Sequence, residues 1–306
     1  MPAALILALG YLLLVSIPAQ MKLPGELAIT TSPADLGLAF ENFSLQPEDA
    51  ELTLQGWWIP ADSPRAVLVF IHGRGSNRDS EFFGSLAFYA AMVERGVSVA
   101  AIDQRNHGAS DRDPRGVLWG VNEKYDALAA IDWVRARVGD SLPLFVMGKS
   151  MGGGTVINAM AERPVADGAI LLDPLLDFHS VVTHGGWVET GLPPAVFAPS
   201  AWAAAAFHGL PGGEGQALAL ASQLDMPILL MQDPDDPVTL AEHAYALAQM
   251  NPNVRLWAAP TVPPDHPDIA WRGRWGTHVA AFVLFPEQFL AQIDRFIGSL
   301  EVAQPD

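Results

Sequence analysis

The chain has 306 residues, half of them hydrophobic, and a formal net charge of −17 at pH 7. This length and composition suffice for a large core, in one big domain or two small ones. The acidity argues against nucleic acid as a partner, because phosphate binding requires a basic face. The chain has no cysteine, which excludes thiol catalysis, disulfides and zinc–thiolate sites.

The N-terminal stretch, residues 2–19, is apolar and carries no charged side chain. It has the length of a signal-peptide core and is slightly short for a membrane span of about 20 residues. Ile17 stands where cleavage after Ala19 would favour a small residue. We predict a signal peptide or membrane anchor over residues 1–20, with a buried helix or a start at Met21 as alternatives. The protein would then be exported or membrane-anchored, and cytoplasmic if the segment is neither.

After a polar, extended lead-in, apolar strands alternate with helical patterns. Strands are predicted at 51–60, 65–73, 97–103, 143–148, 167–174, 226–233 and 253–260. Helices are predicted at 81–96, 122–139, 152–163 and 280–300. The first strand is expected to be antiparallel. The alternation predicts a parallel sheet with helices on both faces and a ligand site beyond the carboxyl ends of the strands.

The stretch "PLFVMGKSMGGGTV" carries two overlapping motifs. Gly148-Lys149-Ser150 matches the end of a phosphate-binding loop. Such a loop, however, also needs a glycine five residues before Gly148. That position is Pro143, which has a fixed φ and no N–H. The second motif places Ser150 on a tight strand-to-helix turn, with small residues required at Gly148 and Gly152. We predict Ser150 as a nucleophile; an ordinary N-capping serine is the alternative.

Two loops could supply the donors that stabilise an oxyanion. His72-Gly73-Arg74-Gly75 follows an apolar strand, and its glycines let the backbone approach a ligand. The backbone N–H of Arg74 and that of Met151, directly after the serine, are the candidate donors. A glycine turn that serves packing alone is the alternative.

An acid and a base should follow later strands, in the order serine, aspartate, histidine. The turn "DPDDPV" offers Asp233, Asp235 and Asp236. We favour Asp236 because it lies deepest in the turn, just before the next helix. Two histidines follow the last strand, and we favour His278, directly before the final helix, over His266. The histidine would take the serine proton, and the aspartate would orient it.

The order of HGRG, DQRNHGAS, GKSMGG, DPDD and a late histidine resembles the α/β-hydrolase superfamily over roughly Leu52–Leu300. Within it the chain is most similar to serine esterases and lipases of the monoacylglycerol-lipase and lysophospholipase-like type. The resemblance implies a mostly parallel eight-stranded sheet with helices on both faces, and a structural role for DQRNHGASD. It assigns a triad of Ser150, Asp236 and His278 and oxyanion donors at Arg74 and Met151. The chain departs from the family pattern at Met231–Asp233, where a glycine is usual, and in the long loop before His278.

An insertion at about 175–224 stands where this superfamily builds a small helical cap. It is rich in Ala, Pro, Trp and Phe, which suits an apolar acyl or alkyl group and also suits packing on the body. The later segment "WRGRW" could hold an acidic or aromatic group, or seal its loop.

We therefore expect an α/β-hydrolase domain at residues 21–306 that hydrolyses carboxylic esters, glycerides and lysophospholipids among them. The reaction would pass through an acyl-enzyme without a cofactor or metal. The partners expected are a small-molecule ester and, through the N-terminal segment, a membrane, with no nucleic acid. A peptidase or thioesterase with the same triad, and a non-catalytic binding protein on this fold, are the alternatives.

Overall fold

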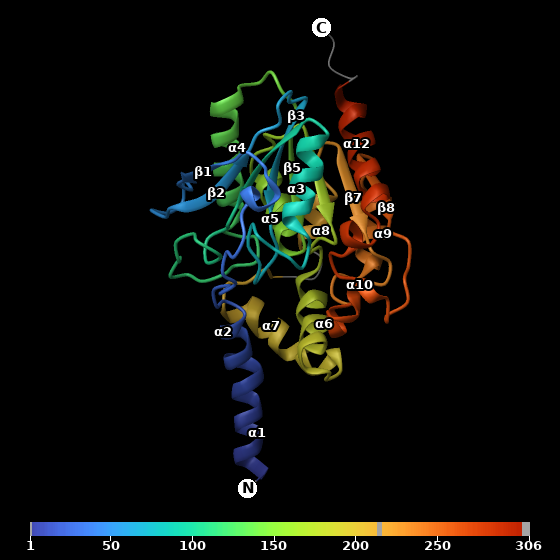
Figure 1. Ribbon diagram of the computed structural model, residues 1–306. Helices are drawn as coiled ribbons and strands as arrows, with labels where there is room; N and C mark the ends of the chain where they lie inside the picture. Colours follow the sequence, from blue (N-terminus) through green and yellow to red (C-terminus); the bar gives the residue numbers. More distant parts are fainter. Residues whose placement is uncertain (1, 213–215, 302–306) are drawn as a thin grey trace.

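A computed structural model describes residues 2–212 and 216–301 of the protein (Figure 1). It contains an eight-stranded sheet in the order β1-β2-β4-β3-β5-β6-β7-β8. The strands are β1 Glu41–Leu45, β2 Leu54–Ile59, β3 Ala66–Ile71, β4 Val97–Ile102, β5 Leu144–Lys149, β6 Gly168–Leu172, β7 Ile228–Gln232 and β8 Val254–Ala258. β1 and β2 run antiparallel to their neighbours, and β3 to β8 are parallel to one another. The sheet is mostly parallel, as the sequence predicted.

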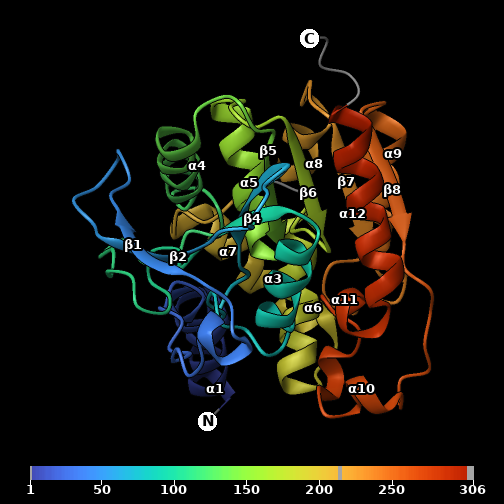
Figure 2. The ribbon, with the colours of Figure 1, turned by 45° about the horizontal axis from the view of Figure 1, so that its top comes forward.

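The central strands are continuous apolar runs because helices cover both faces of the sheet. Along β3, Val67 and Val69 join the core on one face, and Leu68 and Phe70 join the core on the other. The first face is covered by α4 (Lys124–Val138), α5 (Met151–Glu162), α8 (Gln216–Ala221) and α9 (Ala241–Met250). The second is covered by α3 (Ser85–Glu94) and α12 (Pro286–Glu301) (Figure 2).

Two elements differ from the sequence prediction. The extended lead-in forms β1, whose Phe43 lies opposite Gly56 of β2, with its ring in the space that a Cβ on this glycine would occupy. The predicted final helix is two helices, α11 (Ala281–Leu284) and α12. Pro286 separates them because a proline disfavours the helical conformation of the residue before it. Phe285 accordingly has φ −135° and ψ 53°.

Three elements of the predicted insertion lie beyond the carboxyl ends of the parallel strands (Figure 1). They are α6 (Phe178–Thr190), the 3₁₀ turn η3 (Pro194–Phe197) and α7 (Ala198–Phe207). α8, near the end of the insertion, instead packs against α5 in the helical layer of the sheet. Residues 213–215 of the predicted insertion lie outside the described residues.

The N-terminal segment is helical, and its first part projects away from the body (Figure 1). It comprises α1 (Pro2–Tyr11), the π-helical stretch η1 (Leu12–Ser16) and α2 (Ile17–Gln20), together called the N-terminal helix below. Within the described residues it is the one helix long and apolar enough to cross a membrane, with 18 residues of mean hydropathy 2.0. Only 6% of that window is buried, so the alternative of a buried core helix does not fit.

The loop after β4, which carries the motif DQRNHGASD, is held by buried ion pairs. The buried Arg105 guanidinium donates to Asp49, Asp113 and Asp126, and Arg78 donates to Asp103 at 2.7 Å. Burial raises the pKa of Asp126 to about 7 despite its contact with Arg105. Buried charges of this kind must be paired, and their pairing fixes the path of the loop.

Candidate active site

Ser150 lies between the last residue of β5 and the first residue of α5, at the carboxyl edge of the sheet. Its backbone adopts φ 53° and ψ −124°, a strained conformation for a residue with a Cβ. The neighbouring glycines are sterically required. A Cβ on Gly148 would lie 2.2 Å from the carbonyl oxygen of Gly152, and one on Gly152 would lie 2.4 Å from that of His72. The sequence therefore forms the sharp turn that the serine motif predicted.

Three side chains from three loops meet at this turn. His278 Nε2 lies 3.0 Å from Ser150 Oγ, and His278 Nδ1 lies 2.7 Å from Asp236 Oδ2. Asp236 is 42 residues from His278 in the chain, and Ser150 is 128 residues from it. The structure thus brings together the serine, acid and base that the sequence predicted, in the order that proton transfer requires.

The turn after β7 holds the Asp236 carboxylate firmly. Its Oδ1 accepts hydrogen bonds from the backbone N–H groups of Val238 and Thr239, and its Oδ2 accepts one from the Thr239 hydroxyl. Of the two competing acids, Asp235 is exposed. Asp233 is fully buried, and burial raises its pKa to about 6. The alternative base, His266, is half-buried and caps the short helix α10 (Pro267–Ala270).

The two predicted oxyanion donors flank the serine. A Cβ on Gly73 would lie 3.2 Å from Ser150 Cβ and 3.6 Å from its Oγ, so the loop that carries Arg74 passes directly over the nucleophile. Met151 is the first residue of α5, where N–H groups have no partner inside the helix. The Arg74 guanidinium turns to the N-terminal helix and donates to the carbonyl oxygens of Gln20 and Met21.

Asp173 is a site residue that the sequence analysis missed. It follows β6, is fully buried and has a φ of 42°. Its Oδ1 accepts from the N–H of Asp233 at 2.7 Å, and its Oδ2 accepts from the N–H of Val279 at 2.9 Å. Asp173 therefore links the end of β7, which precedes the acid Asp236, to Val279, which follows the base His278. Burial, and then the carboxylates of Asp236 and Asp233, raise the pKa of Asp173 well above its usual range.

The structure also shows that Lys149, directly before the serine, is a buried amine. Its side chain is buried, and Nζ donates to Ser76 Oγ at 3.2 Å, at the end of the loop that carries Arg74. Burial, and then the charge of Arg272, lower the pKa of Lys149 to about 7. The hydrogen bond ties the oxyanion loop to the strand that carries the nucleophile.

The segment "WRGRW" uses both of its arginines to hold protein backbone. Arg272 Nη1 donates to the carbonyl oxygen of His278 at 3.0 Å. Arg274 Nε donates to the carbonyl oxygen of Val188 at 2.7 Å, in the last turn of α6. These contacts seal the loop before the base and attach it to the cap.

One group of described side chains has the proximity of a cation site. Ligand atoms of Asp173, Asp236 and His278 all lie within 4.8 Å of one another. Their oxygens and the His278 Nδ1 are, however, already used in the hydrogen bonds given above. The donor set therefore fits an oriented histidine better than a metal ion.

Comparison with known proteins agrees with this architecture. A family model described as serine aminopeptidase S33 matches residues 62–208. The chain is 30% identical over 166 residues to mouse lysophosphatidylserine lipase ABHD12, covering 46% of this chain and 39% of that protein. It is 32% identical over 130 residues to rat monoglyceride lipase, which covers 42% of this chain and 41% of that protein. The chain thus spans about two fifths of the length of these curated relatives.

Solved structures extend the likeness to nearly the whole chain. The Pyrococcus furiosus esterase Pf2001 superposes with a TM-score of 0.71 at 21% identity, covering 90% of this chain and 97% of that one. The esterase Est1E from Butyrivibrio proteoclasticus gives 0.58 at 16% identity, covering 82% and 98%. Sheet order, the serine turn and these likenesses agree on an α/β-hydrolase fold for this chain.

Proposed function

We propose that the protein is a carboxylic-ester hydrolase that works through an acyl-enzyme on Ser150. The observation that carries the proposal is the hydrogen-bonded chain from Ser150 Oγ to His278 Nε2 (3.0 Å) and from His278 Nδ1 to Asp236 Oδ2 (2.7 Å). A serine hydroxyl is a weak nucleophile, and a histidine held in this geometry can take its proton as attack occurs.

The reaction would proceed in two halves. Ser150 Oγ attacks the ester carbonyl carbon while its proton passes to His278, and the imidazolium then protonates the departing alcohol. Water, deprotonated by the same histidine, attacks the acyl-enzyme, and the histidine returns that proton to Ser150 Oγ as the acid leaves. Asp236 holds the Nδ1–H tautomer and stabilises the imidazolium. The N–H groups of Arg74 and Met151 would donate to the oxyanion, and one such donor contributes about 2.7–4 kcal/mol in comparable enzymes.

We infer a lipid-like ester as the substrate, with a glyceride or lysophospholipid as the first class to test. The named relatives support this choice: one is a lysophosphatidylserine lipase and another a monoglyceride lipase. The composition of the cap, with α6, η3 and α7 over the site, also suits an apolar acyl chain. The N-terminal helix would serve as a signal sequence or membrane anchor, which the exposure of its apolar side chains supports.

A substrate panel tests the proposal. Purified enzyme is assayed on p-nitrophenyl butyrate, a monoacylglycerol, an acyl thioester and an aminoacyl p-nitroanilide. The last two test the thioesterase and peptidase alternatives, and the family description favours including the anilide. Ester turnover should be fastest, should vanish in Ser150→Ala and should persist in the control Ser299→Ala on α12. Equal ester rates in Ser150→Ala and the control would overturn the proposal, and a preference for the anilide would make the protein a peptidase.

A further inference from the structure

One stretch of the cap has no charged residue, although the chain as a whole is strongly acidic and Glu189 and Arg274 lie beside its first residue. From Gly191 to Gly212 there is no Asp, Glu, Lys or Arg, against a net charge of −17 for the chain. Four large apolar side chains of this stretch are exposed by 37–70%: Leu192, Val196, Trp202 and Phe207, called the neutral cap face below. Two of them, Trp202 and Phe207, lie in ring contact at 5.3 Å, and exposed apolar groups that gather mark an interaction surface, whereas single ones do not.

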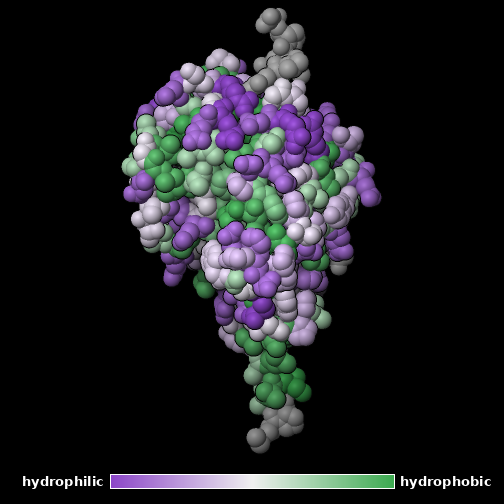
Figure 3. All heavy atoms as spheres, turned by 45° about the vertical axis from the view of Figure 1, so that its right-hand side comes forward, coloured by the Kyte–Doolittle hydropathy of each residue, from purple (hydrophilic) through white to green (hydrophobic). Residues whose placement is uncertain are grey.

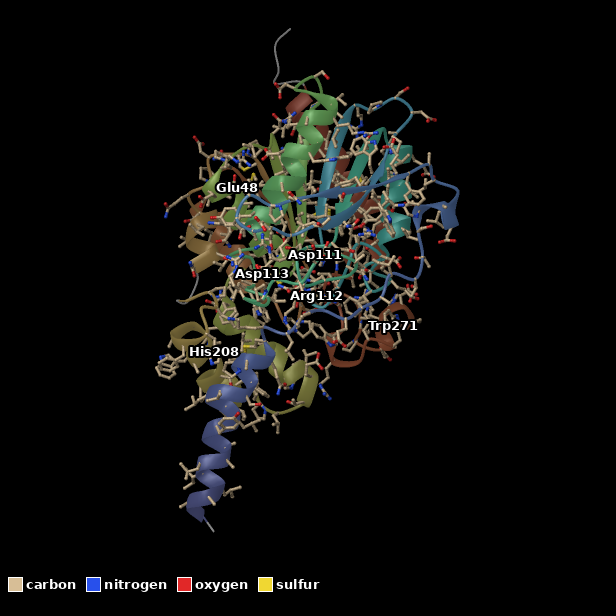
Figure 4. All side chains as sticks on the ribbon, turned by 90° about the vertical axis from the view of Figure 1, so that its left-hand side faces the viewer. Glu48, Asp111, Arg112, Asp113, His208 and Trp271 are labelled. Atoms are coloured by element: carbon tan, nitrogen blue, oxygen red, sulfur yellow. The ribbon has the colours of Figure 1, made fainter. Side chains whose placement is uncertain are left out.

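The neutral cap face adjoins the N-terminal helix. α7 packs against η1 and α2, and Lys22 Nζ donates to the carbonyl oxygen of His208 at the end of α7. Figure 4 places His208 where the N-terminal helix meets the body. Figure 3 shows the helix as an apolar column that leaves a body whose surface mixes polar and apolar patches. The helix that carries Trp202 and Phe207 thus adjoins the N-terminal helix.

The length of the N-terminal helix sets the depth of the cap. The apolar window Ala3–Gln20 has 18 residues, about 27 Å at ~1.5 Å per residue, against a hydrocarbon core of ~30 Å. A bilayer that takes up this window must also reach η1 and α2, against which α7 is packed. The part of the helix before η1, α1, has 10 residues and covers about half of that thickness. Insertion of the helix therefore brings α7 to the lipid surface.

We propose that the neutral cap face lies in the membrane interface beside the N-terminal helix, with a lipid bilayer as its partner. Trp202 and Phe207, whose rings stack edge-to-face at 5.3 Å, would enter the level of the headgroups. The lack of charge suits this position because the face loses no ionic hydration on insertion.

The placement would also direct the active site toward lipid. Arg74, from the loop over Ser150, donates to the carbonyl oxygens of Gln20 and Met21, and Trp119 Nε1 donates to Met21 at 3.0 Å. The end of the N-terminal helix thus meets the loop that carries Arg74. Transfer of a lipid ester from the bilayer to Ser150 rests on the proposed function, whereas docking of the cap does not.

The test uses single cysteines, because the chain has none of its own. The full chain carrying F207C is labelled with the fluorophore NBD and reconstituted into phosphatidylcholine vesicles. The matched control is M250C, an exposed apolar position at the end of α9. It precedes β8 and so lies near the edge where the parallel strands begin, opposite the cap. Quenching is measured with nitroxide lipids, and with iodide in the water.

We expect nitroxide lipids to quench NBD at position 207 and leave position 250 unaffected. A nitroxide near the glycerol should quench more than one near the chain end, while iodide should quench position 250 more strongly. Failure of the full chain to bind vesicles, or no lipid quenching at position 207 in the bound protein, would overturn the proposal. Protection from iodide without lipid quenching would assign the face to a protein contact instead. None of these results depends on hydrolysis, so they stand apart from the test of the proposed function.

Discussion

Replacing Lys149 by methionine should stabilise the protein at neutral pH. The side chain is 2% exposed, its Nζ donates to Ser76 Oγ, and burial lowers its pKa from 10.5 to about 7. At ~1.36 kcal/mol per pH unit, this difference costs about 4 kcal/mol of folding free energy at pH 7, where the folded-state amine is half protonated. Methionine has a similar length and no charge. Its loss of one hydrogen bond costs ~1 kcal/mol, which leaves a net gain of ~3 kcal/mol.

The sign of the pH dependence follows from proton counting. Between pH 7 and 10.5 the unfolded chain holds a proton on Lys149 that the folded chain lacks, so the stability of the wild type rises with pH. The advantage of Lys149→Met should therefore fall by ~1.4 kcal/mol per pH unit, approaching zero near pH 9.5. Below pH 7 both states are protonated, and the advantage should stay constant.

Urea unfolding of both proteins at pH 7 and pH 9.5 measures this difference. The control is Lys124→Met, which breaks the surface ion pair of Lys124 with Glu162 and should lower stability by less than ~1 kcal/mol. If Lys149→Met is less stable than the wild type at pH 7, or if its advantage is the same at both pH values, the buried-amine argument is wrong.

Three further outcomes are expected. In steady-state kinetics, His278→Ala should lower ester turnover by several orders of magnitude, and His266→Ala should lower it far less. Asp236→Asn should lower turnover more than Asp233→Asn does. A reversed ranking in either pair would show that the assignment is wrong. Deleting residues 1–20 should leave a soluble, active enzyme, and loss of cooperative thermal unfolding would show that the segment belongs to the core. On p-nitrophenyl esters, kcat/KM should rise about fourfold per added methylene, at ~0.8 kcal/mol each, up to a medium chain; a decline from acetate onward would show that the cap residues pack only against protein.

The sequence predicted those features that depend on local pattern. The serine turn could be predicted because it requires glycine at 148 and 152 for steric reasons, and both glycines lie within the five-residue motif. The parallel strands could be predicted because strands covered on both faces are unbroken apolar runs. The sequence could favour Asp236 over its neighbours only by its place in the turn. In the structure, Asp236 is the acid that is hydrogen-bonded to His278.

Other features depend on contacts between distant residues. Asp173 bonds to backbone groups 60 and 106 residues away, and only the strand-end position of "LLDP" could have drawn attention to it. The burial of Lys149 depends on how the loop ending at Ser76 folds over it. The break at Pro286 was visible in the sequence, but the apolar periodicity around it favoured a single helix. Docking of Arg74 onto the N-terminal helix joins positions 53 and 54 residues apart, which no local pattern reveals.

The central claim is that Ser150 is the nucleophile, and covalent labelling tests it most directly. The full chain is treated with a fluorophosphonate, digested and examined by mass spectrometry, alongside Ser150→Ala and His278→Ala. We predict one phosphonyl adduct, on the peptide that contains Ser150, with no labelling of Ser150→Ala and much slower labelling of His278→Ala. An adduct on another residue, or equal labelling of Ser150→Ala, would contradict the account.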